Sequence, residues 1–83
     1  MALIHYKNED FNELINDELV IVDFFATWCG PCRMLSPVLE EIQDKYKIVK
    51  VDIDESNDLA KKYGVMSVPT IIKFKNGEEI DKN

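Results

Sequence analysis

The stretch that most constrains the fold runs from Leu19 to Phe25, where every residue except Asp23 is apolar. A strand with one face in water alternates apolar and polar residues, whereas a strand covered on both faces is apolar almost throughout. The pattern therefore predicts a central strand with other elements packed on each of its faces. A layered α/β fold meets that requirement.

The remaining elements are predicted from periodicity and turn residues. From Cys32 to about Tyr46 an apolar stripe predicts an amphipathic helix, which Pro37 should kink. This stripe consists of Leu35, Val38, Leu39, Ile42 and Tyr46. Two shorter helices are expected, one carrying Phe11, Leu14 and Ile15 after a cap at Asn8 or Asp10, the other capped by Ser56 or Asn57 and ended by Gly64.

Three further strands are expected over Ile4–Tyr6, Ile48–Ile53 and Thr70–Lys75. The Asn76-Gly77 pair is a strong hairpin signal, and the returning strand would cover Glu78–Asp81. Strands alternating with helices predict parallel pairings, and the hairpin adds an antiparallel one. The expected result is a single domain over residues 1–83 with a mixed sheet between helices.

Charge and hydropathy exclude several functions. Sixteen acidic against ten basic residues give a net charge of -6, which opposes binding to nucleic acid. The apolar run Leu19–Val22 is far too short to span a membrane, and the N-terminus lacks the pattern of a secretory signal. We therefore expect a cytoplasmic protein.

The chemistry is expected in Trp28-Cys29-Gly30-Pro31-Cys32, which holds both cysteines of the chain. A C-x-x-C pair between a strand and a helix favours thiol–disulfide exchange. The alternatives are a structural disulfide, half of a zinc site and two inert thiols. Zinc prefers four protein ligands, and His5 is the one further typical nitrogen or sulfur ligand, so we predict neither metal nor cofactor.

The spacing of the cysteines suggests a different role for each of them in disulfide exchange. A sulfur at the start of a helix lies beside unpaired N–H groups, which lower the pKa of the Cys29 thiol and favour its thiolate. Pro31 suits the first turn of that helix, where the donor it lacks would be unpaired anyway. Cys32, one turn further on, could then resolve a mixed disulfide formed by Cys29.

The segment from Val22 to Met34 closely resembles the active-site segment of the thioredoxin family, as do Ser67–Thr70 and Phe74–Gly77. The resemblance extends over nearly the whole chain, and the Gly-Pro pair between the cysteines resembles thioredoxin proper. It implies a thioredoxin-like three-layer α/β/α fold with a central mixed sheet. It also implies reduction of disulfide-containing protein substrates, with thioredoxin reductase as the electron donor.

The resemblance assigns further roles near the dithiol. Asp23 matches the family's buried acid, which accepts the proton of Cys32, and Lys50 matches a lysine near that acid. Without the resemblance, Asp23 could equally be an exposed acid at a strand end. Lys50 could be a lysine whose head reaches water.

Substrate binding is assigned to residues on both sides of the cysteines. Trp28, Gly30 and Pro31 would contact the substrate, although Trp28 alone could be a surface-packed aromatic. Val68 would pair with the substrate backbone and Pro69 would follow a cis bond. By sequence alone these two residues could simply lead into the following strand.

The chain departs from the family pattern after the hairpin. Thioredoxins continue into a closing helix, whereas this sequence ends at Asn83. We expect the fold to stop after the hairpin, with one part of the sheet uncovered and able to drive self-association. The alternative functions are a noncatalytic binding module, a fragment with reduced activity and a domain of a larger disulfide isomerase.

Overall fold

The computed structural model describes residues 2–83, which form a five-stranded sheet and three helices. The strands are β1 (Ala2–His5), β2 (Val20–Phe25), β3 (Lys47–Asp52), β4 (Thr70–Lys75) and β5 (Glu78–Lys82); the helices are α1 (Phe11–Ile15), α2 (Gly30–Ile42) and α3 (Asn57–Lys62). The strand order is β1-β3-β2-β4-β5. The β1–β3 and β2–β3 pairs are parallel, and the β2–β4 and β4–β5 pairs are antiparallel.

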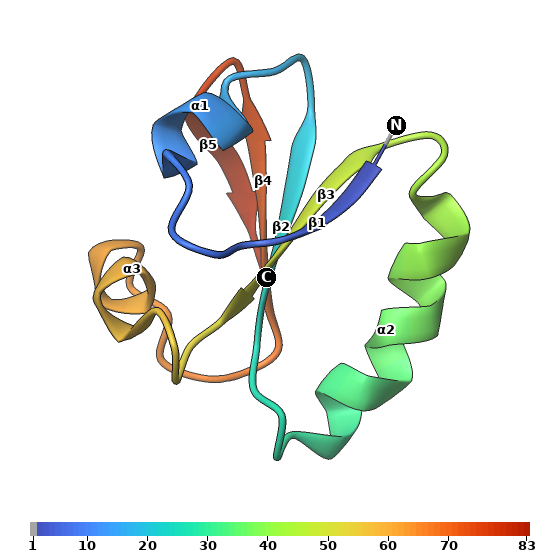
Figure 1. Ribbon diagram of the computed structural model, residues 1–83, viewed down its shortest axis with the longest axis vertical. Helices are drawn as coiled ribbons and strands as arrows, with labels where there is room; N and C mark the ends of the chain where they lie inside the picture. Colours follow the sequence, from blue (N-terminus) through green and yellow to red (C-terminus); the bar gives the residue numbers. More distant parts are fainter. Residues whose placement is uncertain (1) are drawn as a thin grey trace.

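Figure 1 shows α2 on one side of the sheet and α1 and α3 on the other. The mixed sheet and the three-layer α/β/α arrangement predicted from the sequence are therefore confirmed.

The apolar run in β2 is buried on both faces, as its composition predicted. Val20, Val22 and Phe24 belong to the core cluster that includes Phe11 of α1 and Ala60 of α3. Ile21 lies in a second cluster, with Ile48 of β3 and Leu39 of α2. The strand that carries the exceptional Asp23 is thus the centre of the molecule.

Several element boundaries differ from the predicted ones. The first strand is Ala2–His5 rather than Ile4–Tyr6, and α2 covers Gly30–Ile42 rather than Cys32 to about Tyr46. Val38 was placed on the buried stripe of α2, but it is 51% exposed. Leu35, Leu39 and Ile42 form the packed stripe instead.

The caps follow local hydrogen-bonding chemistry. Asp10, not Asn8, caps α1, and its side chain accepts the N–H of Glu13 at 3.3 Å. Ser56 precedes α3, but its side chain makes no capping bond, which corrects the predicted role. Gly64 follows the end of α3 with φ +66°, a conformation that glycine adopts readily.

The predicted hairpin is confirmed. Asn76 and Gly77 connect β4 to β5 with φ values of 51° and 85°. Two consecutive positive φ values are typical of the tight turns that match the twist of paired antiparallel strands.

Candidate active site

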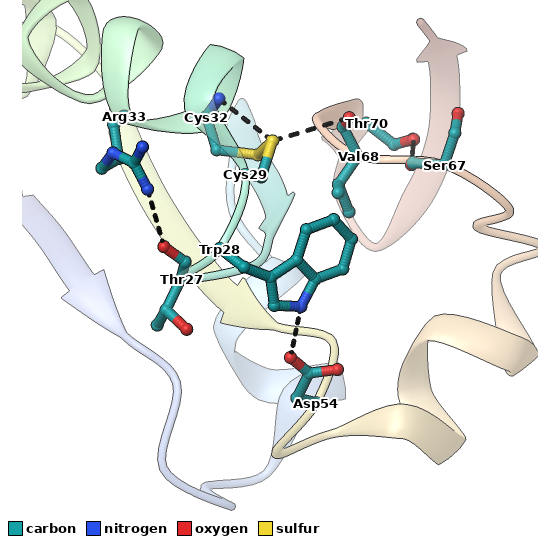
Figure 2. Close-up of a disulfide and its surroundings, with 9 residues drawn as sticks. All are labelled: Thr27, Trp28, Cys29, Cys32, Arg33, Asp54, Ser67, Val68 and Thr70. Carbon is teal, nitrogen blue, oxygen red and sulfur yellow. Dashed lines mark hydrogen bonds between the residues drawn. A yellow bond between two sulfur atoms is a disulfide. The ribbon is translucent and has the colours of Figure 1, made fainter.

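The two cysteines lie at the N-terminus of α2, immediately beyond the end of β2. Cys29 is the N-cap residue, and Gly30 and Pro31 are the first two helical positions. The N–H of Cys32 donates to the Sγ of Cys29 at 3.2 Å, and the two sulfurs form a disulfide (Figure 2). A cysteine in this position faces the positive end of the helix, where a thiolate is stabilised.

The loop before β4 lies against the first sulfur. The Sγ of Cys29 is 3.7 Å from the carbonyl oxygen of Val68, and the Val68–Pro69 bond is cis. The hydroxyl of Thr70 donates to the carbonyl of Ser67, which ties this loop to the start of β4 (Figure 2). The cis bond agrees with what the resemblance implied for Pro69. The disulfide leaves little sulfur exposed, since Cys29 is 5% and Cys32 3% accessible.

Trp28 presents an apolar surface next to the disulfide. Its side chain is 66% exposed, and its indole Nε1–H donates to Oδ2 of Asp54 at 2.9 Å (Figure 2). The guanidinium of Arg33 donates to the carbonyl of Thr27 at 3.0 Å, which links α2 to the loop that carries Trp28. The exposed indole is therefore held in one orientation by a hydrogen bond.

Asp23 is fully buried beneath this region. Neither oxygen of its carboxyl group has a hydrogen-bond partner among the described residues. Burial raises the pKa of Asp23 from its ordinary value of 3.8 to about 6, while the positive charge of Lys50 acts in the opposite direction. The interpretation of Asp23 as an exposed acid at a strand end is therefore wrong.

Lys50 is the neighbour of Asp23 in the register of β2 and β3. Its Nζ donates to Oγ of Ser36 at 2.8 Å and lies 4.8 Å from the centre of the Phe25 ring. The residue is buried and lines a cavity, with its ammonium bonded to Ser36 of α2. Both charged residues of the predicted site are thus in the interior, on the face of the sheet that α2 covers.

A cavity of about 240 Å³ connects these parts of the site. Its lining consists of Phe25, Ala26, Thr27, Cys32, Arg33, Ser36 and Lys50. The cavity thus contacts both Cys32 and Lys50, and Lys50 is the strand neighbour of Asp23. Although its lining is mostly apolar, a cavity of this size has room for water beside the hydroxyl of Ser36 and the ammonium of Lys50.

Two residues of this site had no assigned role in the sequence. Ser36 follows Cys32 by four positions, a spacing that puts both on one helix face and could have indicated it. Asp54 bonds the indole of Trp28 across 26 positions of sequence, and no local pattern indicates such a contact.

Comparisons with known proteins agree with this geometry. The thioredoxin family model matches residues 2–83. The thioredoxin of Staphylococcus epidermidis is 49% identical over 86 residues, covering 99% of this chain and 83% of the relative. The thioredoxin of Bacillus subtilis is 46% identical over 85 residues, covering 98% and 82%.

Solved structures give the same result. The reduced thioredoxin pre-protein of Schistosoma mansoni superposes with a TM-score of 0.91 at 42% identity, covering all of this chain and 85% of that one. A mutant thioredoxin from Halobacterium salinarum gives a TM-score of 0.92 at 34% identity, covering 99% and 76%. Over residues 2–83, no helix is long and apolar enough to cross a membrane. The chain belongs to the thioredoxin family and is a thiol–disulfide oxidoreductase.

Proposed function

We propose that Cys29 is the attacking residue and Cys32 the resolving residue in the reduction of protein disulfides. The Cys29 thiolate attacks one sulfur of the substrate disulfide, forming a mixed disulfide and releasing the other substrate sulfur as a thiolate. Cys32 then loses its proton and attacks the Cys29 sulfur. The second substrate thiolate leaves, the substrate has gained two electrons, and the protein carries the Cys29–Cys32 disulfide.

The observation that carries this proposal is the position of Cys29 as the N-cap of α2. Its sulfur accepts the N–H of Cys32 at 3.2 Å, and the same hydrogen bond would stabilise a negative charge on that sulfur. Cys32 lies in the first turn of the same helix and forms the disulfide with Cys29. The second step is therefore intramolecular and fast.

Asp23 is proposed to take the proton of Cys32. With a pKa raised to about 6 by burial, the carboxyl is mostly ionised at neutral pH and still binds a proton more tightly than an ordinary aspartate. Lys50 would stabilise the ionised form, because its charge lowers that pKa. The cavity beside Cys32 and Lys50 supports a proton transfer through water rather than by direct contact.

The proposed substrate surface consists of Trp28, Gly30, Pro31, Val68 and Pro69. The exposed indole of Trp28 supports a role in holding an extended substrate chain. The half-buried Val68 beside the Cys29 sulfur could pair its backbone with that of the substrate.

The domain organisation, the electron donor and the cellular compartment are also proposals. We propose that residues 1–83 act as one domain, with thioredoxin reductase as the electron donor and the cytoplasm as the compartment. Both relatives named above are bacterial thioredoxins, which supports this setting. Self-association through the sheet stays a prediction, supported by the apolar Ile80 of β5, which is 54% exposed.

Trapping of the mixed disulfide tests the order of attack. A substrate disulfide is mixed with the reduced Cys32→Ser and Cys29→Ser variants, and the adducts are identified by intact mass. We expect a stable adduct on Cys29 in the Cys32→Ser variant and little adduct in the Cys29→Ser variant. The assignment is overturned if Cys32 of the Cys29→Ser variant captures substrate equally well. If wild type and Cys29→Ser are equally unable to reduce the substrate, the chain is a binding module.

A further inference from the structure

Ser36 lies on the same face of α2 as Cys32, one turn further into the helix. Residues four apart in an α-helix are neighbours on its surface, and both of these line the cavity beside the sheet. Ser36 has no part in the exchange described above. Its hydroxyl nevertheless makes the shortest polar contact of the buried lysine.

The hydroxyl of Ser36 accepts a hydrogen bond from the Lys50 ammonium. A buried ammonium needs acceptors, and this one has the Ser36 oxygen at 2.8 Å and the face of the Phe25 ring at 4.8 Å. Asp23 is the strand neighbour of Lys50, yet the ion pairs within 4.0 Å among residues 2–83 do not include this pair. The Lys50 ammonium is therefore hydrogen-bonded to α2 and is not within ion-pair distance of the Asp23 carboxylate.

Other charged groups are attached to the same elements. Those that share the Asp23 face of the sheet or line the cavity include His5 on β1, Asp52 on β3, Lys73 on β4 and Arg33 on α2, with Cys32 as the further titratable side chain of the reduced protein. Lys73 lies 3.8 Å from Asp81, and Arg33 is bonded to the carbonyl of Thr27. The charge that acts on Asp23 is that of Lys50.

We propose that Ser36 is a positioning residue, whose hydroxyl holds the Lys50 ammonium off Asp23 and so keeps the carboxyl an effective proton acceptor for the dithiol. If the hydroxyl were removed, the ammonium would lose this acceptor, while both oxygens of Asp23, its strand neighbour, have no hydrogen-bond partner among the described residues. A direct ion pair would then stabilise the ionised carboxyl and weaken its affinity for a proton. This inference rests on the proposed role of Asp23.

The test is an NMR titration of the Asp23 side-chain carboxyl carbon in the full chain, without substrate. In Ser36→Ala we expect the midpoint to fall by about one pH unit, because an opposite charge has moved closer. Ser36→Thr keeps the hydroxyl and should restore the original midpoint. Ser56→Ala removes a hydroxyl from the buried serine that precedes α3 and should leave the midpoint unchanged.

A double-mutant cycle separates positioning from a structural effect. In a Lys50→Met background, Ser36→Ala should cause no further shift of the Asp23 midpoint, because there is no ammonium to reposition. The inference is overturned if Ser36→Ala leaves the midpoint in place, or if it causes the same shift with and without Lys50. Neither result depends on catalysis. The proposed role of Asp23 fails separately, if Asp23→Asn exchanges disulfides at the wild-type rate.

Discussion

At the scale of single residues, the site combines a sulfur that accepts a backbone N–H with a carboxyl that has no hydrogen-bond donor among the described residues. The Sγ of Cys29 accepts an N–H at the start of α2, whereas both oxygens of Asp23 lack hydrogen-bond partners among the described residues. The first arrangement favours a charged atom, and the second disfavours one. The two groups are thereby suited to opposite roles, nucleophile and proton acceptor.

The buried carboxyl makes the stability of the fold depend on pH. Because folding raises the pKa of Asp23 from 3.8 to about 6, the folded state binds this proton more tightly than the unfolded state. The proton on Asp23 therefore stabilises the folded state by about 3 kcal/mol below pH 3.8, and this stabilisation is lost as the pH rises through about 6. Asp23→Asn should remove this decline, so the variant should be more stable than wild type at pH 7.

Denaturant unfolding of both proteins between pH 3 and pH 8 measures the effect, and their exchange rates are compared on the same samples. We expect the stability difference to grow through this window while Asp23→Asn slows the exchange. Parallel stability profiles would show that Asp23 titrates normally in the folded state. An unchanged exchange rate at every pH would remove it from the mechanism.

Whether the role of a residue could be predicted depended on how far apart in the sequence its contacting residues lie. Asp23 was detected because one acid interrupts an apolar strand, and Cys29 because the chain has a single C-x-x-C pair. The partners of Trp28 and Lys50 were not predicted. Asp54 and Ser36 reach them only after loops and helices have packed, which no local pattern encodes.

At the scale of elements, the sequence predicted the kinds of structure better than their ends. The predicted stripe of α2 included both Val38 and Leu39, but Leu39 packs against Ile21 and Ile48 whereas Val38 is exposed. The start of α2 moved from Cys32 to Gly30 because Cys29 itself provides the cap. The first strand is Ala2–His5 because its partners are Lys47–Lys50 of β3.

One contact between elements links β5 to the C-terminus of α3. The Nζ of Lys82 donates to the carbonyl oxygens of Tyr63 at 3.0 Å and Gly64 at 3.1 Å. A cation at this end of a helix also interacts favourably with its dipole. Lys82→Met should therefore lower the free energy of unfolding by about 1 kcal/mol.

The matched control is Lys75→Met, which removes an exposed lysine from the neighbouring strand β4. Thermal and denaturant unfolding of both variants should show the loss only for Lys82→Met. Equal losses in the two variants would attribute the effect to net charge rather than to the bonded carbonyls.

At the scale of the whole molecule, the topology gathers the site at one edge of the sheet. The parallel strands β2 and β3 end there, so the segments that follow them carry Cys29 and Asp54 to the same place. The antiparallel β4 begins there, and its entry loop brings Val68 and Pro69 against the sulfur. Ligands of open α/β sheets commonly bind beyond the carboxyl ends of the strands.

This gathering could be predicted in outline, since alternating strands and helices indicate parallel pairing and an Asn-Gly turn indicates a hairpin. The cis bond before Pro69 was expected only from the family resemblance, and the contact between the Cys29 sulfur and the Val68 carbonyl was not predicted. It joins segments 39 positions apart, and its geometry depends on the packing of α2 and β4 on the same sheet.

The central claim is that the N-terminus of α2 makes Cys29 the reactive thiol. Limited alkylation of the reduced chain at neutral pH, followed by peptide mass analysis, tests it most directly. We predict that Cys29 is labelled before Cys32 and several-fold faster than a cysteine in an unstructured peptide. Equal labelling of the two cysteines, or labelling of Cys29 no faster than that of the peptide, would contradict the account.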